Sequence, residues 1–181
     1  SAVVSYVGST IVAGTVTANA FRGDGSGLTG EYFDNSDFTS LKASRTDPTV
    51  DFNWGSSAPT NTMGTNSFSV RWSGQIEPRY SETYTFYTTA DDGARLWVNE
   101  RLLVARTTYT AAALEMSGRI ALQAGQSYYI RALHKEGNGG DHLAVAWKLS
   151  GGSSPTNGAP PIGGEYLVYR PDTAPGLSFT L

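Results

Sequence analysis

Short segments in which apolar and polar residues alternate are the feature that most limits what this chain can fold into. Phe68, Val70 and Trp72 alternate with Ser69 and Arg71, and a strand with this pattern buries one face and exposes the other. Further strand candidates, bounded by glycine, proline and asparagine, lie at 31–33, 50–54, 83–89, 95–98, 118–125, 128–133, 143–149 and 165–169. Many short strands with such boundaries predict an all-β fold, an antiparallel β-sandwich with short helical turns.

The length of the chain allows one sizeable core with extensions on either side. It has 181 residues, of which 39% are hydrophobic, and this is enough for a single domain. We expect an extended segment or edge strands at 1–29, the sandwich core at 30–150, and a Gly/Pro-rich segment at 151–181 whose final strand packs on the core. A short helical turn is expected only at 110–116.

Large aromatic side chains on the predicted strands are expected in the core, since strand aromatics usually pack there. These are Trp72, Trp97, Tyr128 and Trp147. Trp54 and Tyr109 lie near predicted loops, where an aromatic ring is either part of the core or a platform on which a ligand stacks.

The composition excludes several classes of function. A net charge of -3 and a charged fraction of 16%, with a pI near 5.3, argue against a nucleic-acid partner. No apolar run approaches the roughly 20 residues that cross a bilayer, so we expect no membrane insertion. The chain has no cysteine, two histidines and no Gly-x-Ser-x-Gly motif. It therefore offers few of the side chains that serve as nucleophile and general base in nucleophilic catalysis. We expect a monomeric, non-enzymatic module from a secreted or surface protein.

Two adjacent acids stand between two strand candidates, in the sequence Asp91-Asp92-Gly93. Adjacent carboxylates at a tight turn repel each other, and most turns need only one aspartate. The pair is either a solvated turn that tolerates both charges or a pair of hard oxygen ligands for a divalent cation. The dipeptide alone leaves both interpretations open.

A second glycine-rich turn, at 134–142, joins the strand candidate that ends near Leu133 to the one that begins at Leu143. It carries an amide on Asn138 and a carboxylate on Asp141. By itself it is either a flexible hairpin loop or part of a binding site. If the two turns lie at the same rim, their side chains and one glycine carbonyl nearly fill the shell of 6–8 oxygens that calcium takes.

An ordered set of motifs resembles the protective-antigen-fourteen (PA-fourteen) domain family. The motifs are Gly30-Glu31-Tyr32-Phe33, Trp72-Ser73-Gly74-Gln75-Ile76, the segment from Tyr84 to Asn99 around Ala90-Asp91-Asp92-Gly93, and the closing segment from Tyr128 to Trp147. The resemblance covers roughly residues 30–149 and implies a β-sandwich of secreted and surface proteins. In lectin members of this family an Asp-Asp pair, joined by a cis peptide, binds calcium, and sugar hydroxyls complete the metal shell.

The resemblance assigns these roles to particular residues of this chain. The implied calcium ligands are Asp91, Asp92, Asn138, Gly140 (through its carbonyl) and Asp141. The implied sugar contacts are Asp91, Asp92, Asn138 and Asp141. His142, which follows the second turn, is a further candidate contact that we add to this set, and it would either pack against the apolar face of the sugar or simply face solvent.

These expectations predict a Ca²⁺-dependent carbohydrate-binding (lectin) module of an extracellular, bacterial adhesin that takes part in cell adhesion or biofilm formation. Its partners would be cell-surface glycans or polysaccharides. A structural module stiffened by calcium and an accessory domain of a glycosidase are the alternatives. A peptide receptor is a further one, suggested only by the tripeptide Arg22-Gly23-Asp24, which is also ordinary turn chemistry in a glycine-rich segment.

Overall fold

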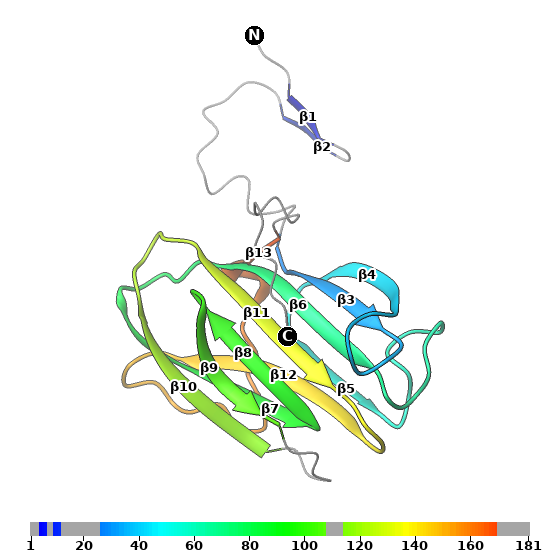
Figure 1. Ribbon diagram of the computed structural model, residues 1–181. Helices are drawn as coiled ribbons and strands as arrows, with labels where there is room; N and C mark the ends of the chain where they lie inside the picture. The colour runs from blue at the N-terminus through cyan, green and yellow to red at the C-terminus, as the bar shows by residue number, and fades with distance from the viewer. Residues whose placement is uncertain (1–3, 7–8, 12–25, 108–113, 170–181) are drawn as a thin grey trace.

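The structure, a computed structural model, describes residues 4–6, 9–11, 26–107 and 114–169, and its regular structure there is almost entirely β (Figure 1). The strands are β1 (Val4–Tyr6), β2 (Ser9–Ile11), β3 (Leu28–Phe33), β4 (Leu41–Asp47), β5 (Asp51–Gly55), β6 (Ser69–Ile76), β7 (Glu82–Asp91), β8 (Gly93–Val98), β9 (Arg101–Arg106), β10 (Leu114–Leu122), β11 (Tyr128–Lys135), β12 (Asp141–Lys148) and β13 (Leu167–Val168). A single 3₁₀ turn, η2 (Gly164–Tyr166), precedes β13.

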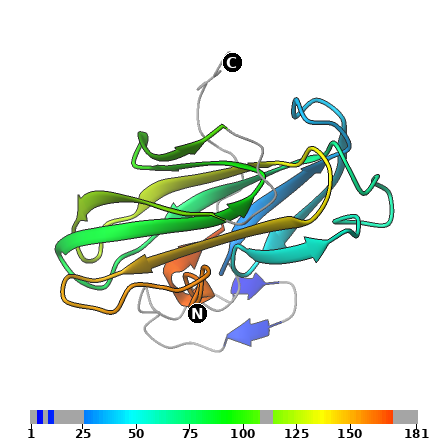
Figure 2. The ribbon, with the colours of Figure 1, turned by 90° about the horizontal axis from the view of Figure 1, so that it is seen from below.

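Two antiparallel sheets face each other and enclose the core (Figure 2). The seven-stranded sheet has the order β4-β3-β6-β11-β8-β9, with β13 also paired to β6, and the four-stranded sheet has the order β10-β7-β12-β5. β1 and β2 pair with each other in a separate ribbon. The antiparallel β-sandwich expected from the alternating segments is confirmed.

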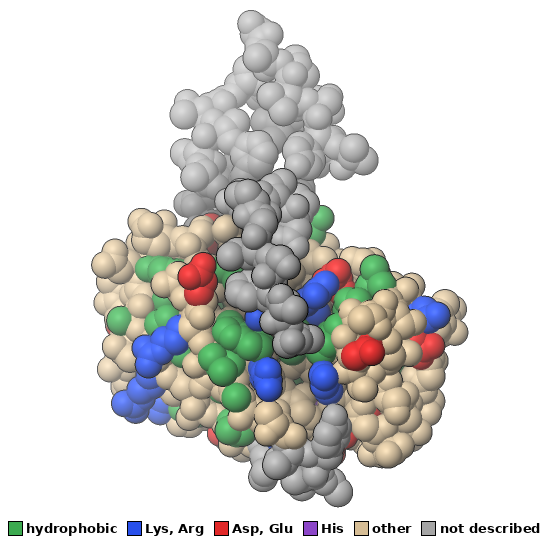
Figure 3. Space-filling model, in the orientation of Figure 1, with side chains coloured by type: hydrophobic (Ala, Val, Ile, Leu, Met, Phe, Trp, Pro, Cys, Tyr) green, Lys and Arg blue, Asp and Glu red, His purple; other side chains and the backbone are tan. Residues whose placement is uncertain are grey.

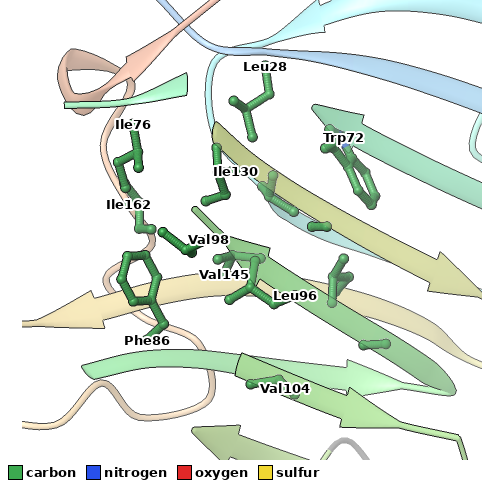
Figure 4. Packing of buried hydrophobic residues seen from close by; sticks show 14 of the residues in the cluster. Leu28, Trp72, Ile76, Phe86, Leu96, Val98, Val104, Ile130, Val145 and Ile162 are labelled. Carbon is green, nitrogen blue, oxygen red and sulfur yellow. The ribbon is translucent and has the colours of Figure 1, made fainter. Parts of the chain in front are cut away.

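The core lies between the sheets and follows the alternation of the strands. On β6 the side chains of Val70, Trp72 and Ile76 are fully buried. The outward-facing residues Arg71, Ser73 and Gln75 are half-buried. Leu143 and Val145 of β12 close the core from the other sheet. In Figure 4, Trp72 and Ile76 of β6 and Val145 of β12 lie between the two layers.

A buried carboxylate fixes the position of β3, β4 and β6 relative to each other. Asp47 accepts hydrogen bonds from the Tyr32 hydroxyl at 2.6 Å, the Trp72 indole N–H at 2.7 Å and the Arg45 guanidinium at 2.7 Å. Gly30 leaves room for this network, since a Cβ there would overlap Asp47 Oδ2. Burial, followed by the hydrogen bond to Asp47, raises the pKa of Tyr32, so its hydroxyl stays a donor at neutral pH.

The core extends beyond the predicted limits of 30–150 on both sides. Leu28 of β3 is buried at its start, and Ile162 and Leu167 are buried in the C-terminal part. β13 pairs with the end of β6. The final strand expected in the Gly/Pro-rich segment thus packs on the core, and the core takes in residues on both sides of 30–150.

The helical turn expected at 110–116 is wrong for its last residues, because β10 begins at Leu114 and pairs with β7 over nine residues. Residues 110–113 lie outside the described part of the chain, and so does Arg22-Gly23-Asp24. None of the described segments forms a helix with the length and hydropathy of a membrane span.

One prediction about an aromatic residue needs correction, and for another the structure decides between the two alternatives. Trp97 is half-buried on the outer face of the seven-stranded sheet, where the Arg131 guanidinium lies 4.3 Å from its ring, because the strand parity that buries Leu96 points Trp97 outward. Trp54 is no exposed platform, since its ring stacks on Phe52 at 5.2 Å and packs against the core. Tyr109 lies outside the described residues. Trp72 is in the core as expected, and Tyr128 and Trp147 pack against it.

Candidate functional site

Two connections that cross between the sheets meet at one rim of the sandwich. β7 and β12 are neighbours in the four-stranded sheet, and β8 and β11 are neighbours in the seven-stranded sheet. The chain passes from β7 to β8 and from β11 to β12, so both connections run between the same two pairs of strands. The register places His142 opposite Asp91 and Lys135 opposite Gly93. The two turns that the sequence singled out are therefore adjacent, and we call this end of the molecule the acidic rim, defined by Asp91, Asp92, Glu136 and Asp141.

The first connection consists of the two adjacent aspartates. A cis peptide bond joins Asp91 to Asp92, as the family resemblance implied. Asp92 is buried, and its Oδ2 accepts a hydrogen bond of 2.9 Å from the backbone N–H of Gly137 in the second connection. Asp91 is half-buried at the end of β7. The aspartate pair thus faces the loop at 136–140, and the interpretation as a solvated turn is excluded for Asp92.

The second connection contributes two buried carboxylates. Glu136 and Asp141, at its two ends, are 0% and 1% exposed. Among the described residues no donor reaches any of their four carboxylate oxygens. The Glu136 carboxyl instead lies within hydrogen-bonding reach of the Asp141 and Asp92 carboxyls, which can bond to it only when a proton is shared. Buried anions without donors are costly, so this arrangement requires either protons or a cation.

The protonation of these groups reflects their burial and their mutual repulsion. The pKa of Glu136 is raised to about 9, and burial is the largest cause. The hydrogen bond and the charge of Asp141 come next, followed by those of Asp92. Burial is also the first cause of the raised pKa of Asp141, with the charges of Asp92 and Asp91 adding to it. The pKa of Asp91 is raised by burial and by Asp92. Glu136 therefore keeps at neutral pH a proton that this acid would release in water.

Positive groups near the rim offset only part of this repulsion. The charges of Arg106 and His142 act on Asp91 and oppose the rise of its pKa. The Arg106 guanidinium is buried and donates to the backbone carbonyl of Ala90. His134 supplies no charge, because burial lowers its pKa to about 4.

Sequence reasoning missed Glu136 as a rim residue. The inward parity of Tyr128, Ile130 and Ala132 continues through the fully buried His134 to Glu136. The signal that could have found it is this parity, extended one residue past the end of β11 into the glycine-rich turn. Glycine-rich turns are usually solvated, which is why the pattern did not indicate a buried acid there.

The remaining predicted site residues lie at the exposed part of the second connection. Asn138 and Gly140 are exposed at its tip, and the N–H of Gly139 lies 3.5 Å from the Asn66 side-chain oxygen. His142 is half-buried on β12, between Asn53 and Asp91 in the register. The fold thus brings Asp91, Asp92 and Asp141 together and places Asn138, Gly140 and His142 around them.

The donor set of the acidic rim suits a hard divalent cation. Carboxylate, amide and backbone carbonyl oxygens are the ligands that calcium prefers, whereas zinc prefers nitrogen and sulfur. In the described segments, no group of three or more histidine, aspartate or glutamate side chains is placed to hold a metal ion. A calcium site here would therefore also use the amide and carbonyl oxygens of the exposed tip. The observation in favour of such an ion is the set of buried carboxylate oxygens without donors, whose charge it would neutralise.

Fold and rim together define the class of protein: an antiparallel β-sandwich binding module whose candidate site is a set of acidic oxygens at the end of the sheets. The family model of the PA14 domain matches residues 24–159. The chain belongs to the PA14 domain family, the family that its motifs resemble.

Several known proteins contain a related segment. The anti-sigma-I factor RsgI3 of Acetivibrio thermocellus is 50% identical over 110 residues, which are 61% of this chain and 17% of that protein. A solved anti-sigma factor domain-containing protein is 38% identical with a TM-score of 0.74, and the match covers 85% of this chain and 51% of the other. The similarity therefore spans under a fifth of the first relative and about half of the second.

Among the solved structures, the PA14 sugar-binding domain from an RTX adhesin has the same fold. It is 17% identical with a TM-score of 0.64, and the match covers 80% of this chain and 99% of that domain. At this identity the likeness concerns the fold alone.

Proposed function

We propose that this chain is a calcium-dependent carbohydrate-binding module that does no catalysis. The observation that carries the proposal is the buried pair Glu136 and Asp141, whose carboxylate oxygens face Asp92 and find no donor in the described structure. A divalent cation would remove this repulsion and would bind where oxygen ligands are already gathered. Support for a sugar ligand comes from the fold, which is that of the sugar-binding domain of an RTX adhesin.

The residues of the rim and of the loop tip would hold the ion and would leave part of its shell accessible to a sugar. Asp91, Asp92 and Asp141 would supply charged oxygens, with Glu136 as a further ligand or as an acid that braces them. Asn138, by its side chain, and Gly140, by its carbonyl, would complete the protein part of the shell from the exposed tip. Calcium bound there would supply open positions that two neighbouring sugar hydroxyls can occupy.

Burial determines which side of the site a sugar can reach. Glu136 and Asp141 lie beneath the loop and are closed to solvent, whereas Asn138 and Gly140 are exposed and Asp91 is half-buried. A saccharide would therefore approach from the side of Asp91 and the loop tip. His142, half-buried beside Asp91, stays a candidate for packing against the sugar ring.

The sequence identities favour an anti-sigma factor over an adhesin as the kind of protein to which this module belongs. The identity of 50% to an anti-sigma-I factor is far above the 17% to the adhesin domain. We therefore infer that the module binds an extracellular polysaccharide on behalf of a protein of the anti-sigma factor type. Presentation outside the cell and a role in adhesion or biofilm formation remain compatible with this assignment, and both stay proposals.

A structural calcium site is the second candidate, and one observation favours it. The most buried carboxylates of the rim lie at the two ends of the second connection, so an ion there would hold the loop in place even without any sugar. This candidate predicts stabilisation by calcium with no glycan binding. An accessory domain of a glycosidase would instead bind the substrate of a separate catalytic domain.

The test combines a calcium titration with a glycan array of neutral and acidic oligosaccharides, each with and without chelator. We expect calcium to bind by calorimetry and glycan binding to disappear on chelation. Asp92→Asn should abolish both, while Asp51→Asn, an exposed aspartate on β5, should change neither. Glycan binding that persists in chelator would refute the calcium-dependent mechanism. Calcium binding without binding of any glycan would leave only the structural role.

A further inference from the structure

A cavity next to the acidic rim carries the opposite charge. It has a volume of about 400 Å³ and opens on the outer face of the seven-stranded sheet, between the start of β8 and the end of β11. Its lining includes Arg95, Arg106 and Lys135, together with apolar atoms of Leu133 and Phe38. Among the described residues that line the cavity there is no aspartate or glutamate. In Figure 3, Lys and Arg side chains (blue) flank exposed apolar groups (green) on this face.

The three cations differ in how they are held. Arg106 is buried and its guanidinium donates to the backbone carbonyl of Ala90 in the other sheet, so its charge lies behind the wall of the cavity and not in the open space. The Lys135 ammonium lies 5.3 Å from the centre of the Phe38 ring. Arg95 is exposed, and no ion pair found among the described residues involves it or Lys135. Arg95 and Lys135 are thus the two adjustable cations at the cavity, and the fixed charge of Arg106 lies behind its wall.

Nearby acids lie outside the cavity. Asp91 and Asp92 precede Gly93, which lines the cavity, and they face the second connection on the other side of the β7–β8 corner. Asp37 precedes Phe38, and its carboxylate accepts a hydrogen bond of 2.6 Å from the Thr39 hydroxyl. The cations therefore keep an excess of positive charge at the cavity. A guanidinium pairs with a planar carboxylate through two parallel hydrogen bonds.

We propose that this cavity is a subsite for the carboxylate of an acidic saccharide, with Leu133 and Phe38 as the apolar wall against its ring. The proposal rests on the proposed function, because it places a uronic-acid residue of the same bound glycan beside the rim. Gly93 links the two places, since it follows Asp92 directly and lines the cavity. The glycan would thus be a polymer that contains uronic acids, and the rim would hold hydroxyls while the cavity holds a carboxylate.

Three matched probes separate this proposal from the calcium mechanism. They are uronic-acid trisaccharides, their methyl esters, and the same trisaccharides with each carboxyl reduced to an alcohol, titrated calorimetrically into the whole chain with calcium. We expect the acids to bind at least about tenfold more tightly than the esters and alcohols, the range of one lost charged hydrogen bond. This preference should shrink as salt rises. Inorganic sulfate in excess should weaken acid binding no more than chloride does at equal ionic strength.

Two variants locate the effect. Arg95→Gln should reduce the affinity for the acids to that for the esters, whereas Arg119→Gln, which removes the same charge from an exposed position on β10, should not. Equal affinity for acids and alcohols, or equal effects of the two variants, would overturn the subsite and leave the calcium mechanism standing. Strong competition by sulfate would show a general anion site instead of a sugar subsite. No calcium-dependent binding of any probe would overturn both proposals.

Discussion

Glu136 offers the sharpest test of the acidic rim, because its replacement should stabilise the chain and damage its function together. In Glu136→Gln the buried carboxyl becomes an amide of nearly the same shape. The amide cannot ionise, and its NH₂ group can donate to the carboxylates of Asp141 and Asp92, which lie within reach of this side chain. The substitution therefore removes a repelling acid and adds a donor to a site where the structure shows none.

The size of the effect follows from the shift in the pKa of Glu136 from 4.5 to about 9. At pH 7 the unfolded chain carries this group ionised and the calcium-free folded chain carries it protonated, which costs about 3 kcal/mol. The buried amide keeps part of the desolvation cost, so we expect Glu136→Gln to gain about 1–3 kcal/mol without calcium. For a domain of this size that is an increase in Tm of about 3–10 °C.

The pH dependence has a defined sign. Because folding raises the pKa of Glu136, the stability linked to this group is complete below pH 4.5 and is lost as the pH rises towards about 9. The advantage of Glu136→Gln over the wild type should therefore be small at pH 5 and large at pH 8.5. Glu115→Gln, an exposed position on β10, should show no such trend.

The assay is urea or thermal unfolding in chelator at pH 5, 7 and 8.5, repeated with calcium. Calcium at a hundred times its Kd should stabilise the wild type by about 2.7 kcal/mol, and Glu136→Gln by less. A variant that is less stable than the wild type at pH 8.5 in chelator would refute the argument from buried repulsion. A calcium response equal to that of the wild type would show that Glu136 lies outside the metal site.

Three further substitutions test the rim and the frame that supports it. Asp141→Asn should weaken calcium binding at least about tenfold in calorimetry, because one charged oxygen ligand is lost; unchanged affinity would remove the second connection from the site. Asp47→Ala should lower the free energy of unfolding by about 3–5 kcal/mol in urea, because two buried donors lose their acceptor, whereas Asp51→Ala on exposed β5 should cost little. Gly30→Ala should also destabilise the fold, since its methyl group would overlap the Asp47 carboxylate; wild-type stability would show that this network adjusts freely.

The alternating segments were sufficient to predict the architecture and much of the core. Val70 and Trp72 on β6, and Leu143 and Val145 on β12, are buried as their spacing predicts. Edge strands were harder to find. β4 is exposed or half-buried along nearly its whole length and ends in the buried Asp47, so it has no apolar face to produce an alternating pattern.

The sequence by itself also determined which residues of the rim are acidic and which are adjacent, as with Asp91 and Asp92. It could not determine that Glu136 and Asp141 are closed to solvent beside them. A period of two residues tells which side of a strand is buried, but not which strand lies opposite. Only the tertiary structure, by placing β7 beside β12 in one sheet and β8 beside β11 in the other, decided that the two acidic connections meet.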